Sequence, residues 1–359
     1  MSNKNEVNEN KDKDKDETIS LIGSLLYSGY KDHQDFRTRA FNRIRCFLRC
    51  VCEGKSPDFV DKKKEETSYS KEYSDKNLPG LIEKMFEQNL LTGSQKTIFL
   101  KLLEIAKKTA SLENSFKPAM KKFVQSNIGP LWDDYLSYVR GVGEVSATTL
   151  FAKIGYCEKF NSVSKLWRYF GLHVVCPKCT EKGMVQVKVG PGEFVEEERT
   201  ISQVVNGAGV CPKCGKRGIA PRARRGVSLG YSQVLRSFGW NLSQSLLKIN
   251  SPIYREIYDT EKDRQLSLSF NIGELEKRYG KPYKREDVGL KLGHAHNRAL
   301  RKMLKIFLQH YYVVGRTLAG CEVSDPFVKA HMNHRDIITW RDVLEANGGD
   351  VSVIERKVI

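Results

Sequence analysis

Residues 131–154 read LWDDYLSYVRGVGEVSATTLFAKI, two apolar segments joined by Gly141, Val142 and Gly143. Apolar side chains recur at helical spacing on both sides of this tripeptide, namely at Tyr135, Val139, Ala147 and Leu150. Glycine lets the backbone turn tightly, and the helix that follows directs its unpaired N–H groups and positive dipole end outward, where a phosphate binds. The stretch therefore predicts a helix-hairpin-helix that contacts DNA phosphates through Arg140 and the three hairpin residues. A purely structural turn is the alternative interpretation.

The hairpin is the first of several motifs that follow one another along the chain. VRGVGEVSATTLFAKIG occupies residues 139–155, FNSVSKLWRYFGL residues 160–172, and RGVSLGYSQVLR residues 225–236. In their order and spacing these segments resemble the IS-one-ten family of insertion-sequence transposases, and the resemblance covers residues 100–320. It implies a C-terminal transposase-like domain that binds DNA and acts in DNA transposition or recombination.

Two CPKC motifs lie between the matched segments, and they supply Cys176, Cys179, Cys211 and Cys214. In a reducing compartment, paired CxxC motifs indicate metal ligands before disulfides. The intervening residues 184–189, MVQVKV, alternate as a strand does. The pattern predicts a zinc ribbon in which the four cysteines hold one structural Zn²⁺, because four thiolates leave no open coordination position. A redox-active CxxC is the alternative, but that motif needs one pair in a βαβ context.

The charge of the chain indicates its partner. The 60 Lys and Arg residues exceed the 43 Asp and Glu residues and leave a formal charge of +17, which favours a polyanion. We therefore expect DNA as the partner, and structured RNA and a homo-oligomer stay open. The N-terminus is polar, and no apolar run reaches the about 18 residues of a membrane span, so no membrane partner is expected. The expected location is the cytoplasm, in association with the nucleoid.

The whole sequence predicts a mainly α fold, with the zinc ribbon as a small β-rich insertion. Apolar periodicity predicts two helices within residues 17–52 and a long helical pattern over residues 81–138, interrupted at Pro118 and before Pro130. The expected parts are a disordered charged tail (1–16), a helical region with a polar linker (17–78), a helical arm (79–138), the helix-hairpin-helix part of the transposase-like domain (139–172), the zinc ribbon (173–220), the rest of that domain (221–320) and a C-terminal extension (321–359).

Residues 294–316 predict a long helix with two different faces. Its apolar face carries Leu300, Met303, Leu304, Phe307, Tyr311 and Val314. Its opposite face carries Arg298, Arg301, Lys302 and Lys305. We expect the first face to pack in the core and the second to form an outward basic ridge that contacts DNA, although a merely solvated face is the alternative. The remaining candidate DNA contacts are Arg222, Arg224 and Arg225, in a basic stretch that begins at Lys216 and Arg217, and a solvated charge run is the alternative.

The resemblance also bears on catalysis, because the family combines four acidic residues on a ribonuclease-H-type half with a nucleophilic serine. Residues 1–130 show no alternating strands on which to place the acidic site. Ser228 is the one candidate nucleophile, with Arg222, Arg224 and Arg225 as nearby cations. Whether the chain is an enzyme is left undecided. Two functions stay open: a transposase or recombinase, and a transposase-derived DNA-binding accessory factor without catalysis in regulation, replication or repair.

Overall fold

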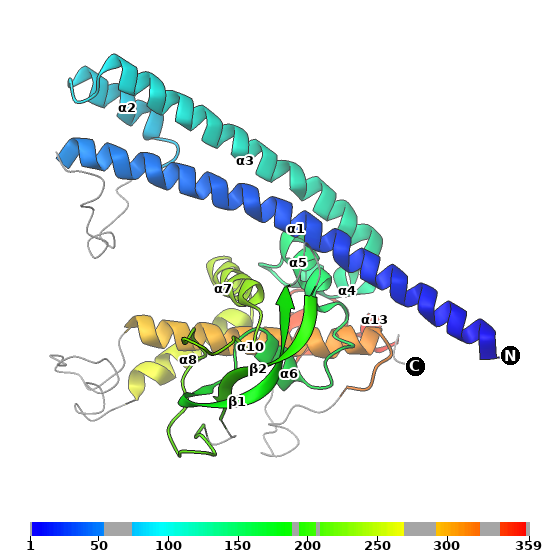
Figure 1. The fold of residues 1–359 in the computed structure, drawn as a ribbon. Coiled ribbons are helices and arrows are strands. Elements are labelled where there is room, and N and C mark those ends of the chain that lie inside the picture. The colour runs from blue at the N-terminus through cyan, green and yellow to red at the C-terminus, as the bar shows by residue number, and fades with distance from the viewer. Residues whose placement is uncertain are drawn as a thin grey trace. The chain divides into compact units, whose positions relative to one another are not determined.

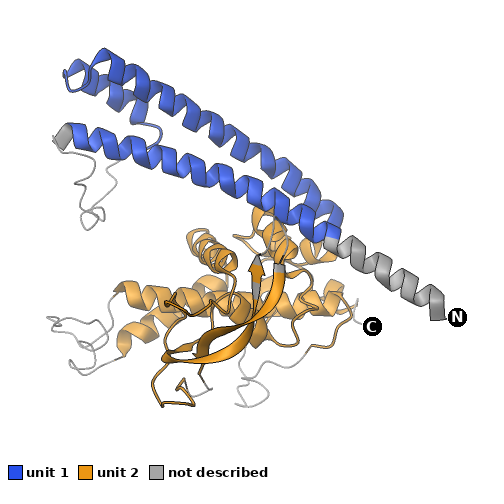
Figure 2. Cartoon of the chain, viewed as in Figure 1, with its two compact units in different colours: residues 1–127 blue, residues 128–359 orange. Residues whose placement is uncertain are grey.

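The chain divides into two compact units, residues 1–127 and residues 128–359 (Figure 2). The computed structural model describes residues 2–53, 74–188, 194–205, 209–268, 292–323 and 338–356. These residues form helices and one two-stranded sheet (Figure 1), which confirms the predicted mainly α class with a small β-rich part. In the described parts of the chain, no helix has both the length and the apolar character that crossing a membrane requires.

Unit 1 is a helical hairpin with one short additional helix. Helix α1 runs over Ser2–Glu53, α2 over Leu78–Glu87 and α3 over Gly93–Asn127. Helices α1 and α3 pack along one another, and α2 packs on α3 (Figure 1). The apolar core that joins them contains Phe41, Ile44, Leu48, Leu78, Leu81, Ile82, Met85, Leu91, Leu103 and Ala106. Burial of these side chains supplies the driving force that holds the three helices together.

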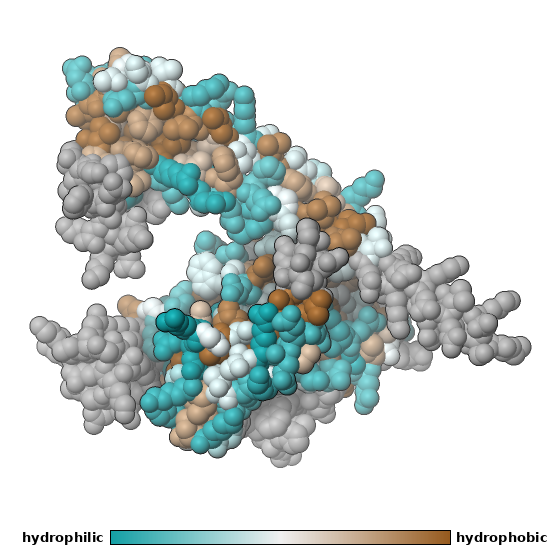
Figure 3. Space-filling view, viewed as in Figure 1, coloured by the Kyte–Doolittle hydropathy of each residue, from teal (hydrophilic) through white to brown (hydrophobic). Residues whose placement is uncertain are grey.

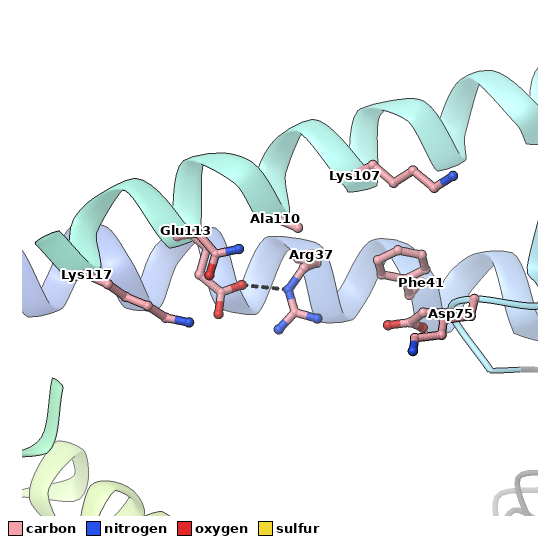
Figure 4. A pocket seen from close by; sticks show the side chains of 9 residues that line it. Arg37, Phe41, Asp75, Lys107, Ala110, Glu113 and Lys117 are labelled. Atoms are coloured by element: carbon pink, nitrogen blue, oxygen red, sulfur yellow. Dashed lines mark hydrogen bonds and ion pairs between the residues drawn. The ribbon is translucent and has the colours of Figure 1, made fainter. Parts of the chain in front are cut away.

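An ion pair also links the two long helices of unit 1. Arg37 on α1 donates from Nε to the Glu113 carboxylate on α3 at 2.6 Å, and the Glu113 side chain is almost fully buried (Figure 4). A buried carboxylate without a partner would lower the stability of the folded protein, so this ion pair favours the observed packing of α1 against α3. Unit 1 also exposes apolar side chains near α2 (Figure 3), among them Phe86, Leu90, Ile98 and Leu102.

The helices of unit 1 differ from the sequence prediction in three places. Residues 2–16, predicted as a disordered tail, belong to α1, and the two helices predicted within residues 17–52 are one. The segment has no proline, and its Lys and Glu residues favour helix, so nothing in the chain interrupts α1. Pro118 lies inside α3 and does not interrupt it, because proline removes a single helical hydrogen bond that a long packed helix tolerates. The predicted break before Pro130 is confirmed, since α3 ends at Asn127.

Unit 2 is built around its longest helix, α10 (Leu292–Leu318). The other elements are α4 (Pro130–Asp133), the 3₁₀ turn η3 (Leu136–Tyr138), α5 (Glu144–Ile154), α6 (Val163–Tyr169), β1 (Val175–Lys188), β2 (Phe194–Val204), α7 (Gln233–Lys248), α8 (Tyr254–Ser267), α12 (Trp340–Ala346) and α13 (Val351–Glu355). Helix α10 contacts α4, α6, α7, α8, α12 and α13. The apolar face predicted for it is confirmed, and these side chains are buried: Leu300, Met303, Leu304, Phe307, Tyr311 and Val314.

A chain of buried polar side chains crosses this core. The hydroxyls of Tyr135 and Tyr254 lie 3.3 Å apart, and the Tyr254 hydroxyl lies 2.9 Å from Nδ1 of His310. Nε2 of His310 donates to the carbonyl of Ile338 at 3.0 Å, so Nδ1 is the acceptor of the Tyr254 hydroxyl. Burial lowers the pKa of the imidazole to about 4, so the ring is neutral at pH 7 and Nδ1 can accept this hydrogen bond.

The sheet is an antiparallel hairpin of β1 and β2, in register from Thr180 opposite Ser202 to Lys188 opposite Phe194. The predicted strand at 184–189 lies in β1 as far as residue 188, and the strand begins earlier, at Val175. An irregularity between Val175 and Thr180 interrupts the pairing, and this is where the first CPKC motif lies.

Candidate metal centre and basic surfaces

The two CPKC motifs meet at the base of the hairpin. One ligand sulfur from each of Cys176, Cys179, Cys211 and Cys214 lies within 4.8 Å of the other three, and the Sγ atoms of Cys176 and Cys214 are 3.6 Å apart. Sulfurs at about 2.3 Å from a tetrahedral ion lie about 3.8 Å from one another. A disulfide would need about 2.05 Å, and all four cysteines are free. The four sulfurs are therefore compatible with one tetrahedral metal ion.

The backbone around the cysteines supports the same arrangement. The N–H groups of Lys178 and Cys179 point to Sγ of Cys176, at 3.4 and 3.2 Å. In the second motif the N–H of Gly215 donates to the carbonyl of Cys211 at 2.8 Å, and Gly215 has a φ of +64°. That left-handed conformation favours glycine, which explains the residue directly after Cys214. Both motifs are thus tight turns that bring their sulfur atoms together.

Cationic side chains surround the cysteine cluster. Lys178 and Lys213 belong to the CPKC motifs themselves and are exposed, as are Lys216, Arg217, Arg222 and Arg225. We call these six residues the ribbon basic surface. The sequence predicted phosphate contacts for four of them, namely Lys216, Arg217, Arg222 and Arg225. The two motif lysines were missed, although the repeated Lys in CPKC was a visible signal.

Arg224 differs from its two neighbours in the predicted DNA-binding set. Its guanidinium donates to the carbonyl of Lys178 at 2.7 Å and to Oγ of Ser202 at 3.4 Å. These contacts tie the segment after the ribbon to the first CPKC turn and to β2. Arg224 is thus a structural residue here, and its donors face the protein.

The hairpin residues lie between η3 and α5. Arg140 and Gly143 are exposed, whereas Val142 is buried and its N–H donates to the carbonyl of Val139 at 3.0 Å. Ser245 on α7 donates to the carbonyl of Gly141 at 2.9 Å. The segment before the hairpin consists of the short helix α4 and the 3₁₀ turn η3, so the element directly before the glycines is a single 3₁₀ turn. The first turn of α5 keeps free N–H groups but also carries the acidic Glu144.

The two hairpin glycines are expected to respond differently to alanine. Gly141 has a φ of +99°, and a Cβ there would lie 3.0 Å from the Leu246 backbone, whereas Gly143 has a negative φ and open space around it. We expect Gly141→Ala to lower the free energy of unfolding of unit 2 by about 1–3 kcal/mol and Gly143→Ala to leave it nearly unchanged. Urea unfolding monitored by tryptophan fluorescence measures this, because all four tryptophans lie in unit 2. Equal stability of the two variants would contradict the packing described for Gly141.

The basic ridge predicted on α10 does not face outward as a whole. The Arg301 guanidinium donates to the carbonyls of Leu172 and His173 at 3.1 and 3.3 Å. Lys305 is half-buried, with its ammonium 4.8 Å from the Trp167 ring, and burial lowers its pKa to about 8. The outward orientation predicted for Arg301 and Lys305 is therefore wrong, because α10 is covered by neighbouring elements on this side as well.

Arg298 and Lys302 lie on the same side of α10 and engage α8. Arg298 donates to Oε1 of Gln265 at 2.6 Å, and Lys302 forms a 2.9 Å ion pair with Glu261. Burial alone would raise the pKa of Glu261, but hydrogen bonds from Arg264, Lys302 and Gln265 lower it to about 2. Both cations thus have partners within the protein.

Ser228 lies where the ribbon joins the helical part of unit 2. It is half-buried, and its N–H donates to the carbonyl of Thr200 at 2.8 Å. Within the described residues, no side chain forms a hydrogen bond with the Ser228 hydroxyl. The nearby Arg224 is engaged by Lys178 and Ser202. Among the described residues, Ser228 thus lacks the hydrogen-bonded base that activates nucleophilic serines.

Comparisons with protein families and structures identify no relative of this chain. No family model matches it, and neither a curated protein nor a solved structure is significantly similar to it. The interpretation of the site therefore depends on its own residues and geometry.

Proposed function

We propose that this chain is a zinc-containing nucleic-acid-binding protein that binds DNA through the ribbon basic surface. The observation that carries the proposal is the four-cysteine cluster with exposed cations around it. Zn²⁺ is the ion of choice, because four cysteines in tetrahedral arrangement are a typical structural zinc site. With all four positions taken by sulfur, the ion orders the ribbon and has no place for a substrate.

The charge of the protein supports DNA as the ligand. The formal charge is +17. In the ribbon basic surface the side chains of Arg217, Arg222 and Arg225 are exposed, so a phosphate can reach them. Cations along a surface neutralise backbone phosphates and read no base sequence. The exposed Arg140 and the free N–H groups at the start of α5 offer a second phosphate contact in the same unit. Structured RNA presents the same phosphates and is a second ligand to test.

The resemblance to IS-one-ten transposases connects this binding with DNA transposition or recombination. Of the two functions, we favour an accessory factor that binds DNA without cutting it. The described residues of unit 1 form helices α1, α2 and α3 and contain no strand that could carry a ribonuclease-H-type acidic site. Ser228 has no hydrogen-bonded base among the described residues. A protein with this function would act in the cytoplasm, in association with the nucleoid.

DNA binding can be tested by charge removal at the ribbon. We expect Arg217→Gln/Arg222→Gln/Arg225→Gln to weaken binding of a labelled duplex at least tenfold at low salt and to reduce the salt slope by about 3, since each lost phosphate contact contributes about 0.9. Fluorescence anisotropy at several salt concentrations measures both quantities. Duplex, branched and single-stranded DNA and structured RNA are compared in the same assay, and supercoiled plasmid with magnesium serves as the cleavage substrate.

The matched control is Lys117→Gln/Lys121→Gln/Lys122→Gln, which removes the same charge from exposed positions on α3. It should bind nearly as wild type does. An equal loss in both variants would show that only total charge matters, and no binding by the wild type would end the proposal. A covalent protein–DNA adduct that Ser228→Ala abolishes would establish the recombinase alternative instead.

A further inference from the structure

Four half-buried cations from three helices lie near one half-buried histidine in unit 2. Arg168 lies in the last turn of α6, Arg236 lies on α7, and Arg301 and Lys305 lie one turn apart on α10. Burial and the charges of all four cations lower the pKa of His173, which follows α6. We call these five residues the His173 cluster. Its members come from distant parts of the sequence, and none of the sequence motifs joins them.

Specific contacts hold three of the cations in place. Arg301 donates to the carbonyls of Leu172 and His173. Arg236 donates to the hydroxyl of Tyr231 at 2.8 Å, and the Tyr231 ring packs edge-on against His173 with the ring centroids 6.2 Å apart. Lys305 lies over the Trp167 ring, whose Nε1 donates to the Lys305 carbonyl at 2.9 Å.

The cluster contains no acidic partner. Within the described ranges, Arg168, Arg236, Arg301 and Lys305 form no ion pair, whereas Lys302 on the same helix pairs with Glu261. The Arg168 guanidinium forms no hydrogen bond with any described residue either. Half-buried cations without counter-charge are costly, because burial and mutual repulsion both oppose the charged forms.

The titration of the cluster reflects this excess of positive charge. Burial and the neighbouring Arg301 lower the pKa of Lys305 to about 8. Burial and the four cations lower the pKa of His173 to about 4, so the ring is neutral at pH 7. Its Nδ1 is shut off from solvent and has no hydrogen-bond partner in the described structure. The cluster thus combines an excess of positive charge with two groups that lack hydrogen-bond partners among the described residues, the Arg168 guanidinium and Nδ1 of His173.

We propose that Arg168, Arg236, Arg301 and Lys305 bind a phosphate group beside His173. A phosphate carries up to two negative charges and several acceptor oxygens, which suits several cations better than a single carboxylate does. Arginine recognises phosphate with two parallel donors, and Arg168 has its donors free of described partners. This site is separate from the ribbon basic surface and goes beyond the proposed function. Its phosphate group could belong to a nucleic-acid backbone or to a small phosphorylated molecule.

The test uses the full zinc-loaded chain, with inorganic phosphate as the probe and sodium chloride of equal ionic strength as the reference. We expect phosphate to raise the tryptophan-monitored Tm of wild type by several degrees relative to chloride, because a ligand of the native state stabilises it. Arg168→Gln should have a higher Tm than wild type in chloride, since it removes one repelling cation. It should bind phosphate at least about tenfold more weakly, the loss expected for one charged donor.

Lys121→Gln/Lys122→Gln is the control for general charge, and it should keep the wild-type response to phosphate. The source of the phosphate is distinguished by anisotropy with a labelled duplex in chloride. If Arg168→Gln weakens the binding of both probes, the site takes backbone phosphate; if it weakens only the response to inorganic phosphate, the site takes a small phosphorylated ligand. A wild-type Tm that is equal in phosphate and chloride, or an unchanged phosphate response in Arg168→Gln, would overturn the proposal whatever the DNA result.

Discussion

Replacing Cys176 and Cys211 by serine is expected to empty the metal site and to disorder the ribbon while the helices remain folded. Structural zinc contributes about 10 kcal/mol or more to the folding of small zinc modules, so the β1–β2 hairpin should not survive without it. The helical core of unit 2 has its own apolar side chains on α7 and α10, and unit 1 contains none of the four cysteines. Mass spectrometry of metal content should find one zinc per wild-type chain and none in the variant.

Hydrogen exchange locates the effect within the chain. Amides of β1 and β2 should exchange much faster in the variant, whereas those of α1, α3 and α10 should keep their protection. Cys321→Ser is the matched control, since Cys321 is outside the cluster and should leave the metal content at one. A Cys176→Ser/Cys211→Ser protein that still carries one tightly bound zinc would contradict the assignment of the ligands.

Unit 2 is also expected to lose stability as the pH falls from 7 to 5. His310 is neutral in the folded protein with a pKa of about 4, whereas the ordinary value is 6.5. Between these values the unfolded chain binds a proton that the folded chain does not, so stability decreases as the pH falls. His310 alone should lower the free energy of unfolding of unit 2 by about 2 kcal/mol between pH 7 and pH 5. His173 has a lowered pKa of the same size and adds to the loss in the same window.

Urea unfolding at pH 7 and pH 5, followed by tryptophan fluorescence, measures the dependence. His310→Gln should be less stable than wild type at pH 7 by about 1–3 kcal/mol, because Tyr254 or Ile338 loses its hydrogen bond, but it should lose less stability toward pH 5. His33→Gln changes a histidine in unit 1 and should keep the wild-type dependence. The buried neutral state of His310 would be wrong if His310→Gln and wild type lost equal stability between the two pH values.

Local patterns in the sequence predicted the parts of the structure that depend on spacing alone. The CPKC motifs predicted a four-cysteine cluster because the ligand type and spacing are specific to such sites. The apolar face of α10 followed from helical periodicity, since apolar residues at this spacing indicate one buried side. The strand at residues 184–188 followed in the same way from the alternation of apolar and polar side chains.

Features that depend on tertiary contacts could not be predicted in this way. A basic helix face has the same sequence pattern whether solvent or protein covers it, so the contacts of Arg301 and Lys305 had no local signal. The His173 cluster joins residues of α6, α7 and α10, which only folding brings together. Pro118 was predicted to interrupt a helix because the free-energy cost of proline can be recognised from the local sequence. The packing of α3 on α1, which outweighs this cost, cannot be recognised from the local sequence.

In the proposed function, a metal-ordered ribbon presents the cations that bind nucleic acid. The most direct test is the affinity of a labelled duplex for zinc-loaded wild type and for Cys176→Ser/Cys211→Ser, measured by anisotropy across a salt series. We predict salt-dependent binding by wild type, with log K falling linearly with log salt, and binding at least about tenfold weaker and a shallower slope in the variant. Equal affinity and equal slope in two proteins with the same helical content would contradict the account.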